Sequence, residues 1–171
     1  VMYEFIGNWD RYVGDAEARK AEFKQLAKKE TEKAFNGWKG KLKAQSKCCP
    51  CFKGYKPKIK IEEVNKKIDM TFFVKPNPFG VYMYGTHSDI IRDEGFVNED
   101  DIILQDDTGV GYKQVGFVHE FGHLIGLTHP SGDFSHGYES YAPDLPSLMG
   151  AGMEMRPHYY EKWVNKANEH E

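Results

Sequence analysis

Residues 119–130 read HEFGHLIGLTHP, which places three histidines, one glutamate and one glycine at fixed spacings. In an α-helix, residues four apart lie on one face and about one turn apart, roughly 6 Å. His119 and His123 can therefore direct their imidazole nitrogens at the same ion. Glu120 is rotated by about 100° from His119. This offset keeps its carboxylate away from the ion itself but beside a water molecule that the ion would carry.

Gly126 gives the chain a place to turn. Because glycine has no Cβ, it can adopt the left-handed conformation that ends a helix. We expect the helix to stop there and the chain to turn sharply, so that His129 becomes a third ligand of the same ion. Three neutral imidazoles leave one tetrahedral position open for water, as in catalytic rather than structural zinc sites. The segment predicts one catalytic Zn²⁺ held by His119, His123 and His129.

Glu120 is the predicted catalytic residue. Zinc lowers the pKa of a bound water towards about 7 and polarises a carbonyl group. Glu120 can take a proton from that water and later deliver it to the leaving amine of a peptide bond. The sequence thus predicts a zinc endopeptidase that acts on protein or peptide substrates. Two alternatives are a hydrolase of the peptide cross-links of cell walls and a zinc-binding domain without activity, in which Glu120 would have no role.

Composition restricts the class of protein around this segment. The chain has 171 residues, of which 40% are hydrophobic and 14% aromatic, enough for one domain with a core and too apolar for a disordered chain. A net charge of −3 gives no electrostatic reason to bind nucleic acid. No uninterrupted run of about 18 apolar residues is present, so no membrane span is expected. We predict a single catalytic domain over residues 1–171.

Hydrophobic periodicity predicts the elements before the histidine segment. Residues 2–6 form a short apolar run typical of a strand, and a long helix begins near Asp15, whose carboxylate can cap it. The helix runs to about Phe35 and ends at Gly37 and Gly40. Alternating or β-branched and aromatic residues predict four more strands, and a polar loop is expected at 85–101. The four strands are 58–64, 68–74, 81–84 and 102–104.

The second half of the chain is predicted to hold two helices. The first carries the histidines and spans about residues 112–126, after the glycines at 109 and 111. An irregular segment rich in glycine, serine and proline follows to Ser147. The last helix begins at Pro157, because a proline in the first turn sacrifices no hydrogen bond.

The extended pattern HExxHxxGxxH resembles the zinc signature of the metzincins, a clan of metallopeptidases. These enzymes also have a methionine-containing turn beneath the metal, which Met149 in the segment 147–150 matches best, with Met153 as the second candidate. The order of predicted elements over the whole chain is similar to that of metzincin catalytic domains. The resemblance implies an α+β fold with a mixed five-stranded twisted sheet, a long backing helix, a zinc-site helix and a C-terminal helix.

The resemblance also implies residues that handle the substrate. In that mapping residues 81–84 are the exposed edge strand, to which a peptide could add through main-chain hydrogen bonds. Two metzincin families carry a tyrosine two residues after the turn methionine, where this chain has Ala151. The group that stabilises the oxyanion must then lie elsewhere, with His136, Tyr138 and Tyr141 as candidates, each of which is otherwise a packing or surface residue of its loop. The edge-strand residues are Val81, Tyr82, Met83 and Tyr84.

The segment 149–157, MGAGMEMRP, is similar to the metallopeptidase domains at the C-terminal ends of VgrG and Rhs-type bacterial toxins. This similarity implies delivery out of the producing cell by a secretion apparatus, a larger parent polypeptide and a cognate inhibitor. The first residues show no signal peptide. A first residue of Val1 suggests a trimmed chain or an excised domain, so the native start is not readable from this sequence.

Three cysteines lie together at positions 48, 49 and 51. An odd number cannot pair completely within the chain, and three thiolates lack the fourth ligand of a closed zinc site. Four interpretations remain open: one local disulfide with a spare thiol, three free thiols, a metal site completed from elsewhere, or a cysteine that blocks the catalytic metal before activation. The residues are Cys48, Cys49 and Cys51.

Overall fold

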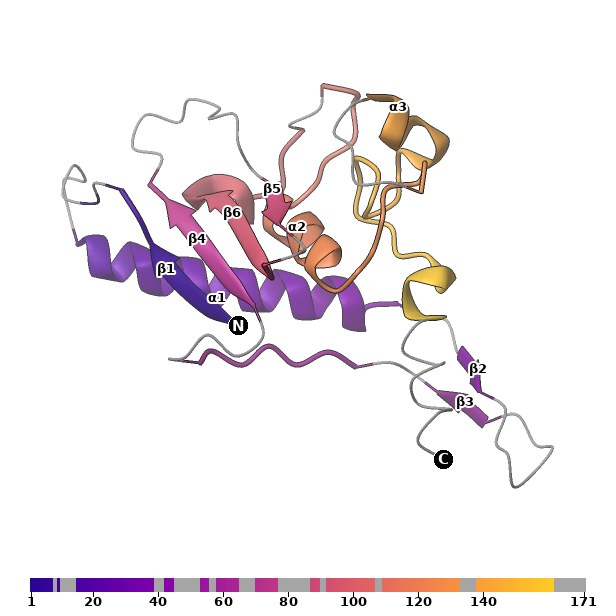
Figure 1. The fold of residues 1–171 in the computed structure, drawn as a ribbon, viewed down its shortest axis with the longest axis horizontal. Helices are drawn as coiled ribbons and strands as arrows, with labels where there is room; N and C mark the ends of the chain where they lie inside the picture. The colour runs from indigo at the N-terminus through magenta and orange to yellow at the C-terminus, as the bar shows by residue number, and fades with distance from the viewer. Residues whose placement is uncertain are drawn as a thin grey trace.

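The computed structural model describes residues 1–7, 9, 15–38, 42–44, 53–55, 58–64, 70–76, 87–89, 92–106, 109–132 and 138–161. These residues confirm the predicted α+β class (Figure 1). The elements are, in order, β1 (Met2–Phe5), α1 (Ala16–Asn36), β2 (Leu42–Ala44), β3 (Lys53–Tyr55), β4 (Thr71–Lys75), β5 (His87–Asp89), β6 (Glu94–Asn98), η2 (Glu99–Ile102), α2 (Gly116–Leu124), α3 (Tyr138–Tyr141), η3 (Ala142–Asp144) and η4 (Pro157–Tyr160).

The main sheet has the strand order β1-β4-β6-β5. β1, β4 and β6 are parallel, and β5 runs antiparallel to β6 at the edge. The described residues therefore form a mixed four-stranded sheet in place of the predicted five strands. β2 and β3 form a separate antiparallel pair. Among the described residues, no helix is both long enough and apolar enough to cross a membrane.

On one face of the sheet, the aromatic ring of Phe72 lies beside Gly95. Tyr3, Phe72 and Gly95 lie next to one another across β1, β4 and β6. A Cβ on Gly95 would lie 2.4 Å from Cε1 of Phe72, so the aromatic ring occupies the space that any other residue would fill. The same ring packs on Phe117 of α2, with 4.3 Å between the ring centroids. Gly95 thus leaves room for the ring on which α2 rests.

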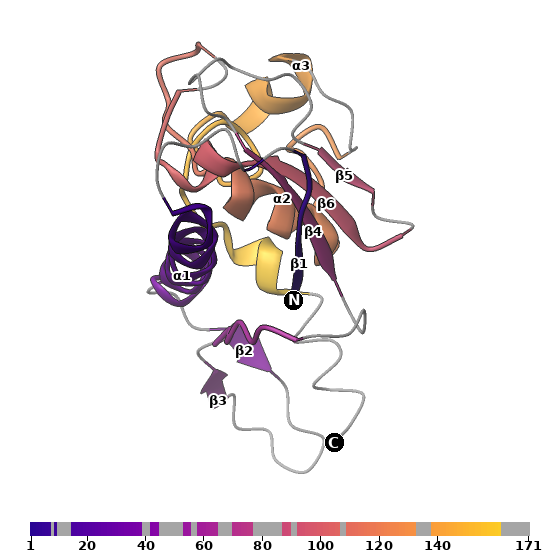
Figure 2. The same ribbon diagram turned by 90° about the vertical axis from the view of Figure 1, so that its left-hand side faces the viewer.

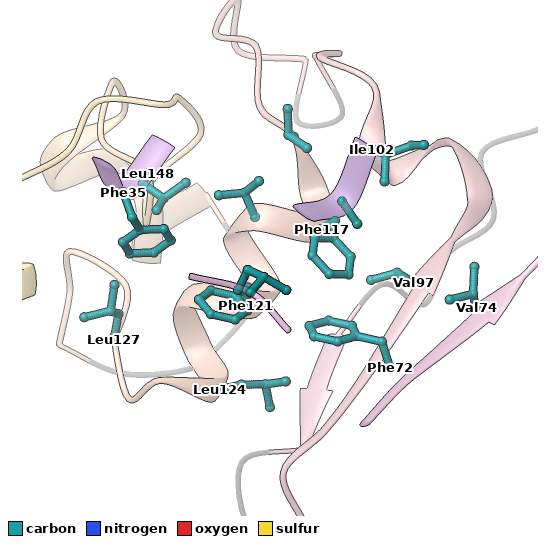
Figure 3. Close-up of a cluster of buried hydrophobic side chains, with 14 of the residues drawn as sticks. Phe35, Phe72, Val74, Val97, Ile102, Phe117, Phe121, Leu124, Leu127 and Leu148 are labelled. Carbon is teal, nitrogen blue, oxygen red and sulfur yellow. The ribbon is translucent and has the colours of Figure 1, made fainter. Parts of the chain in front are cut away.

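α1 and α2 pack against this face together. Phe117 contacts Phe23 of α1, and Phe121, one turn further along α2, contacts Phe35 of α1. Figure 2 looks nearly along α1 and shows both helices on the same side of the sheet. The buried side chains around α2 form the core (Figure 3). Each large apolar side chain buried there contributes about 1.5–3 kcal/mol to the stability of the fold. α2 is therefore held by the sheet through Phe72 and by α1 through Phe23 and Phe35.

The prediction for α1 is confirmed at both ends. Asp15 caps the helix, because its Oδ1 accepts hydrogen bonds from the N–H groups of Glu17 (3.0 Å) and Ala18 (3.2 Å). The helix ends at Asn36, and the N–H of Gly37 donates to the carbonyl of Lys33 at 2.8 Å. Gly37 has a right-handed φ of −72°. A Cβ there would lie 2.6 Å from Lys33 O, so glycine is needed for space rather than for handedness.

The predicted strand at 58–64 is wrong, although its buried face is right. Ile61 is buried and Ile59 packs partly against the core. Their backbone groups pair with side chains of α1 instead of a neighbouring strand: the Asn36 amide bonds both N–H and C=O of Ile59, and Glu32 accepts from the N–H of Ile61. The alternation of apolar and polar residues indicates which face of a segment is buried. It does not indicate which groups form hydrogen bonds with the backbone N–H and C=O of that segment.

The region from 85 to 104 is also corrected. The expected loop at 85–101 contains β5 and β6, whereas the expected strand at 102–104 is the end of the turn η2 and two exposed residues. Ile103 and Leu104 are 56% and 52% exposed. The chain turns after β6 because the carboxylate of Asp101 accepts the N–H of Asn98 at 2.6 Å. This capping interaction starts η2 and ends the strand.

The remaining elements agree in part. The histidine helix is shorter than predicted, because Gln114 pairs with Gln105 and leaves Val115 as the cap of α2. Pro157 begins the short helix η4 as expected, and residues after 161 lie outside the described residues. The predicted strand at 68–74 is β4, shifted to Thr71–Lys75. The proposed edge strand at 81–84 and the three cysteines also lie outside the described residues.

Candidate metal centre

The three predicted histidine ligands lie together and are buried. His119 and His123 come from α2 and His129 from the segment that follows it, with exposed fractions of 6%, 1% and 1%. Their Nε2 atoms form a triangle, with distances of 3.1 Å for 119–123, 3.0 Å for 123–129 and 3.2 Å for 119–129. The three side chains are close enough to hold a metal ion.

Two of the rings have their orientation fixed by backbone carbonyls. Nδ1 of His119 lies 2.9 Å from the carbonyl oxygen of Leu148, and Nδ1 of His123 lies 2.9 Å from that of Leu127. A carbonyl oxygen can only accept, so Nδ1 must donate in both rings. In the neutral imidazole the lone pair is then on Nε2. The two Nε2 atoms that carry these lone pairs lie 3.1 Å apart, close enough for one cation to bind both.

Gly126 turns the chain as the sequence predicted. Its φ is +89°, in the left-handed region. The N–H of Gly126 donates to His123 O at 2.8 Å, and the N–H of Leu127 donates to Gly122 O at 3.0 Å. These two bonds are those of a Schellman motif, which glycine favours. The motif also fixes Leu127, whose carbonyl orients His123, and directs the chain back so that His129 reaches the other two histidines.

The structure places Met149 directly beneath the histidine helix. A Cβ on Gly122 would lie 2.6 Å from the sulfur of Met149, so helix and thioether touch at the glycine between the two helical histidines. Met149 is fully buried. The preceding residue, Leu148, supplies the carbonyl that holds His119. The segment around Met149 therefore contacts the histidine helix through the Met149 side chain and His119 through the Leu148 backbone. Met153, the second candidate, lies instead at the start of α2, where its sulfur accepts the N–H of Val115.

The turn that contains Met149 is closed by an ion pair. Nε and Nη2 of Arg156 donate to the two carboxylate oxygens of Asp144, each at 2.6 Å. These bonds hold the pKa of the Asp144 carboxyl below its ordinary value. Within the turn, the N–H of Met149 donates to the Tyr159 hydroxyl at 3.2 Å. Asp144 and Arg156 thus hold together the two ends of the segment that supports His119.

Asp144→Asn is expected to lower the free energy of unfolding by about 0.5–1 kcal/mol at neutral pH, since the pair is partly exposed. A carboxyl whose pKa is depressed in the folded state stabilises above its unfolded pKa, and this contribution is lost as the pH falls through the folded pKa. The difference between parent and variant should therefore vanish in acid. Thermal unfolding from pH 7 to about pH 2, with chelator in every sample, measures it. A difference that stays constant over this range would contradict the assignment.

Of the three candidate oxyanion donors, the described residues include the side chain of Tyr141. The ring of Tyr141 lies edge-on to His129, with 4.8 Å between centroids, and 6.3 Å from His119. Tyr138 begins the short helix α3, and nothing is described of its side chain; His136 lies outside the described residues. Of the three, Tyr141 is the one that the structure places beside the histidines. Glu120 is buried, 4% exposed, next to His119 in α2.

Sequence reasoning missed the groups that orient the histidines. The carbonyls of Leu127 and Leu148 do this, and a backbone carbonyl is common to every residue type. The first could be anticipated from Gly126, because a Schellman turn fixes the residue that follows it. The Leu148 carbonyl belongs to a segment far from His119 in the sequence. The residue type at position 148 gives no indication that its carbonyl will bond to a histidine.

The comparisons with known proteins add no relative. No family model matches the chain, and no curated protein or solved structure matches it either. The functional argument therefore rests on the geometry of the site.

Proposed function

We propose that this chain is a zinc-dependent endopeptidase, with the metal held by His119, His123 and His129. The observation that carries the proposal is the triangle of Nε2 atoms at 3.0–3.2 Å, two of which present their lone pairs inward. A shared cation would accept a lone pair from each of three buried imidazoles that converge in this way.

The donor set and its spacing favour zinc. Two nitrogens bound to one tetrahedral zinc at about 2.0–2.1 Å lie roughly 3.3 Å apart. The observed separations fall a few tenths of an ångström below this value. Imidazole also suits copper, nickel and iron. Three protein ligands are the number found in catalytic zinc sites, whereas structural sites have four. Among the described residues, the metal-binding cluster contains histidines alone.

Glu120 is the proposed general base and acid. A bound zinc ion acidifies a water molecule and polarises a carbonyl group. Glu120 follows His119 on α2 and is buried, so its carboxylate is held close to the ligands by the helix itself. It accepts the proton of the attacking water and passes it to the departing amine. The ring of Tyr141, beside His129 and His119, makes its hydroxyl the candidate that stabilises the oxyanion.

The substrate is proposed to bind as an extended peptide along β5. This strand lies at the edge of the sheet formed by the described residues and contacts α2. An edge strand offers main-chain hydrogen bonds to a peptide without reading its sequence. Residues 81–84, which the sequence analysis assigned to this edge, lie outside the described residues and stay a prediction. A metzincin-like arrangement is part of the proposal, supported by the order of α1, β4, β6 and α2 and by Met149 beneath α2.

The proposal is tested by incubating the zinc-loaded protein with a diverse peptide pool, with and without chelator. We expect internal cleavage that chelator abolishes and added Zn²⁺ restores. Stoichiometric zinc without cleavage of any peptide would indicate the non-catalytic zinc-binding domain. Cleavage confined to cell-wall cross-link peptides would indicate the cell-wall hydrolase. Delivery as a toxin, with a parent polypeptide and an inhibitor, stays a prediction from sequence resemblance.

A further inference from the structure

The side chain of Gln114 lies in the turn around Met149. Its amide nitrogen, Nε2, lies within hydrogen-bond distance of three carbonyl oxygens: Leu148 at 2.7 Å, Gly152 at 3.0 Å and Gly150 at 3.2 Å. Two of these carbonyls belong to the residues on either side of Met149. One amide group therefore holds the backbone on both sides of the methionine that packs beneath Gly122.

The Leu148 carbonyl is shared between Gln114 and the metal centre. It accepts from Gln114 Nε2 at 2.7 Å and from His119 Nδ1 at 2.9 Å. A carbonyl oxygen has two lone pairs, so it can accept both bonds. The position of this oxygen sets the orientation of the His119 ring. Gln114 is thus linked to His119, a proposed metal ligand, by two hydrogen bonds that share one oxygen atom.

The position of Gln114 is itself fixed by its backbone. Its N–H donates to Gln105 O at 2.8 Å, and its C=O accepts the N–H of Gln105 at 3.0 Å. The next residue, Val115, caps α2 and donates its N–H to the sulfur of Met153. Gln114 therefore connects the start of the histidine helix to the turn beneath it.

We propose that Gln114 is a positioning residue of the metal centre, which fixes the Leu148 carbonyl and through it the His119 ring. The inference rests on the proposed function, because it assumes that the three histidines bind a metal. An amide is suited to this place because it donates N–H bonds without charge. Glutamate is nearly the same shape, but it only accepts and would place a negative charge against three carbonyl oxygens.

The test compares Gln114→Met with Gln25→Met by competition for Zn²⁺ against a chelator of known affinity. Methionine keeps the length of the side chain and removes the donors. Gln25→Met makes the same change at an exposed position of α1, in the first half of the chain. We expect Gln114→Met to weaken zinc binding by about 10–100-fold, the range for partners that orient metal-bound histidines. Gln25→Met should stay within about threefold of the parent.

A second measurement distinguishes a loss of His119 orientation from a general loss of zinc affinity. In the zinc-loaded ¹⁵N-labelled protein, the Nδ1–H protons of His119 and His123 are protected from solvent by Leu148 O and Leu127 O. Gln114→Met should speed solvent exchange at His119 and leave exchange at His123 unchanged. If Gln114→Met does not fold, Gln114→Asn carries the same two measurements, because it keeps the amide one methylene short of the carbonyls.

The outcomes distinguish this inference from the proposed function. Parent-like zinc affinity together with unchanged exchange at His119 would overturn the role of Gln114 while leaving the peptidase proposal intact. A parent that hydrolyses no peptide, but whose zinc affinity falls as expected on Gln114→Met, would support the inference and refute the peptidase. A parent that does not bind Zn²⁺ would overturn both.

Discussion

Glu120→Gln is expected to lower peptide hydrolysis by about 10²–10⁴-fold, the range for removal of a general acid–base group, while Zn²⁺ stays bound. The amide has almost the same shape as the carboxylate, so the packing of α2 is preserved. It cannot accept the proton of the attacking water, which is the step assigned to Glu120. The proposed zinc ligands are the three histidines of the described cluster, so metal affinity should change little. Initial rates on a cleaved peptide, with zinc content measured in parallel, test this.

The matched control is Glu139→Gln. Glu139 is an exposed glutamate on α3, outside the histidine cluster. The same change of carboxylate to amide there should leave the rate at the parent value. A Glu120→Gln variant that turns over as fast as the parent would remove Glu120 from the mechanism. Equal losses in both variants would point to a general charge effect.

His129→Ala is expected to weaken zinc binding by more than about 100-fold, beyond the loss typical of an orienting partner, and to abolish hydrolysis. The two remaining histidines on α2 lack the third ligand of a catalytic zinc site. His129 lies after Gly126, outside α2, and its buried ring packs on His119, His123 and Tyr141. The fold should therefore persist. Zinc content after dialysis and circular dichroism measure the two effects separately.

His158→Ala serves as the control for this prediction. His158 is an exposed histidine in η4, outside the metal-binding cluster. Its removal should change neither zinc content nor rate. A His129→Ala variant that retains zinc at the parent affinity would show that the third ligand is another residue. Together, the two largest predictions separate metal binding from proton transfer, because one variant keeps zinc and the other loses it.

The parts of the fold that sequence predicted are those set by nearby residues. α1, its Asp15 cap and the turn at Gly126 depend on contacts within a few residues of one another. The three ligands were found for the same reason, since His119 and His123 are one helical turn apart and Gly126 directs the chain to His129.

The errors lie where burial depends on a distant partner. β6 looked like a loop because Gly95 has no apolar side chain, and its place in the sheet comes from the Phe72 ring that covers it. Residues 102–104 looked like a strand because they are apolar, yet Ile103 and Leu104 are exposed after the turn at Asp101. The hydrophobic pattern of a sequence predicts which residues can be buried. Whether a given residue is buried depends on the side chains that pack around it in the folded protein.

The sequence by itself predicted which three histidines lie together and where the chain turns to bring them there. Spacing along a helix fixes which side chains share a face, and a glycine permits the turn that follows. Only the tertiary structure decided how the rings are oriented. The Leu148 carbonyl bonds to His119 and the Gln114 amide bonds to that carbonyl, and Leu148 and Gln114 lie on opposite sides of His119 in the sequence. A backbone carbonyl is present in every residue, and a glutamine carries no metal-binding signal. Both act on His119 only because folding brings the Gln114 amide and the His119 ring to the same oxygen atom, that of Leu148.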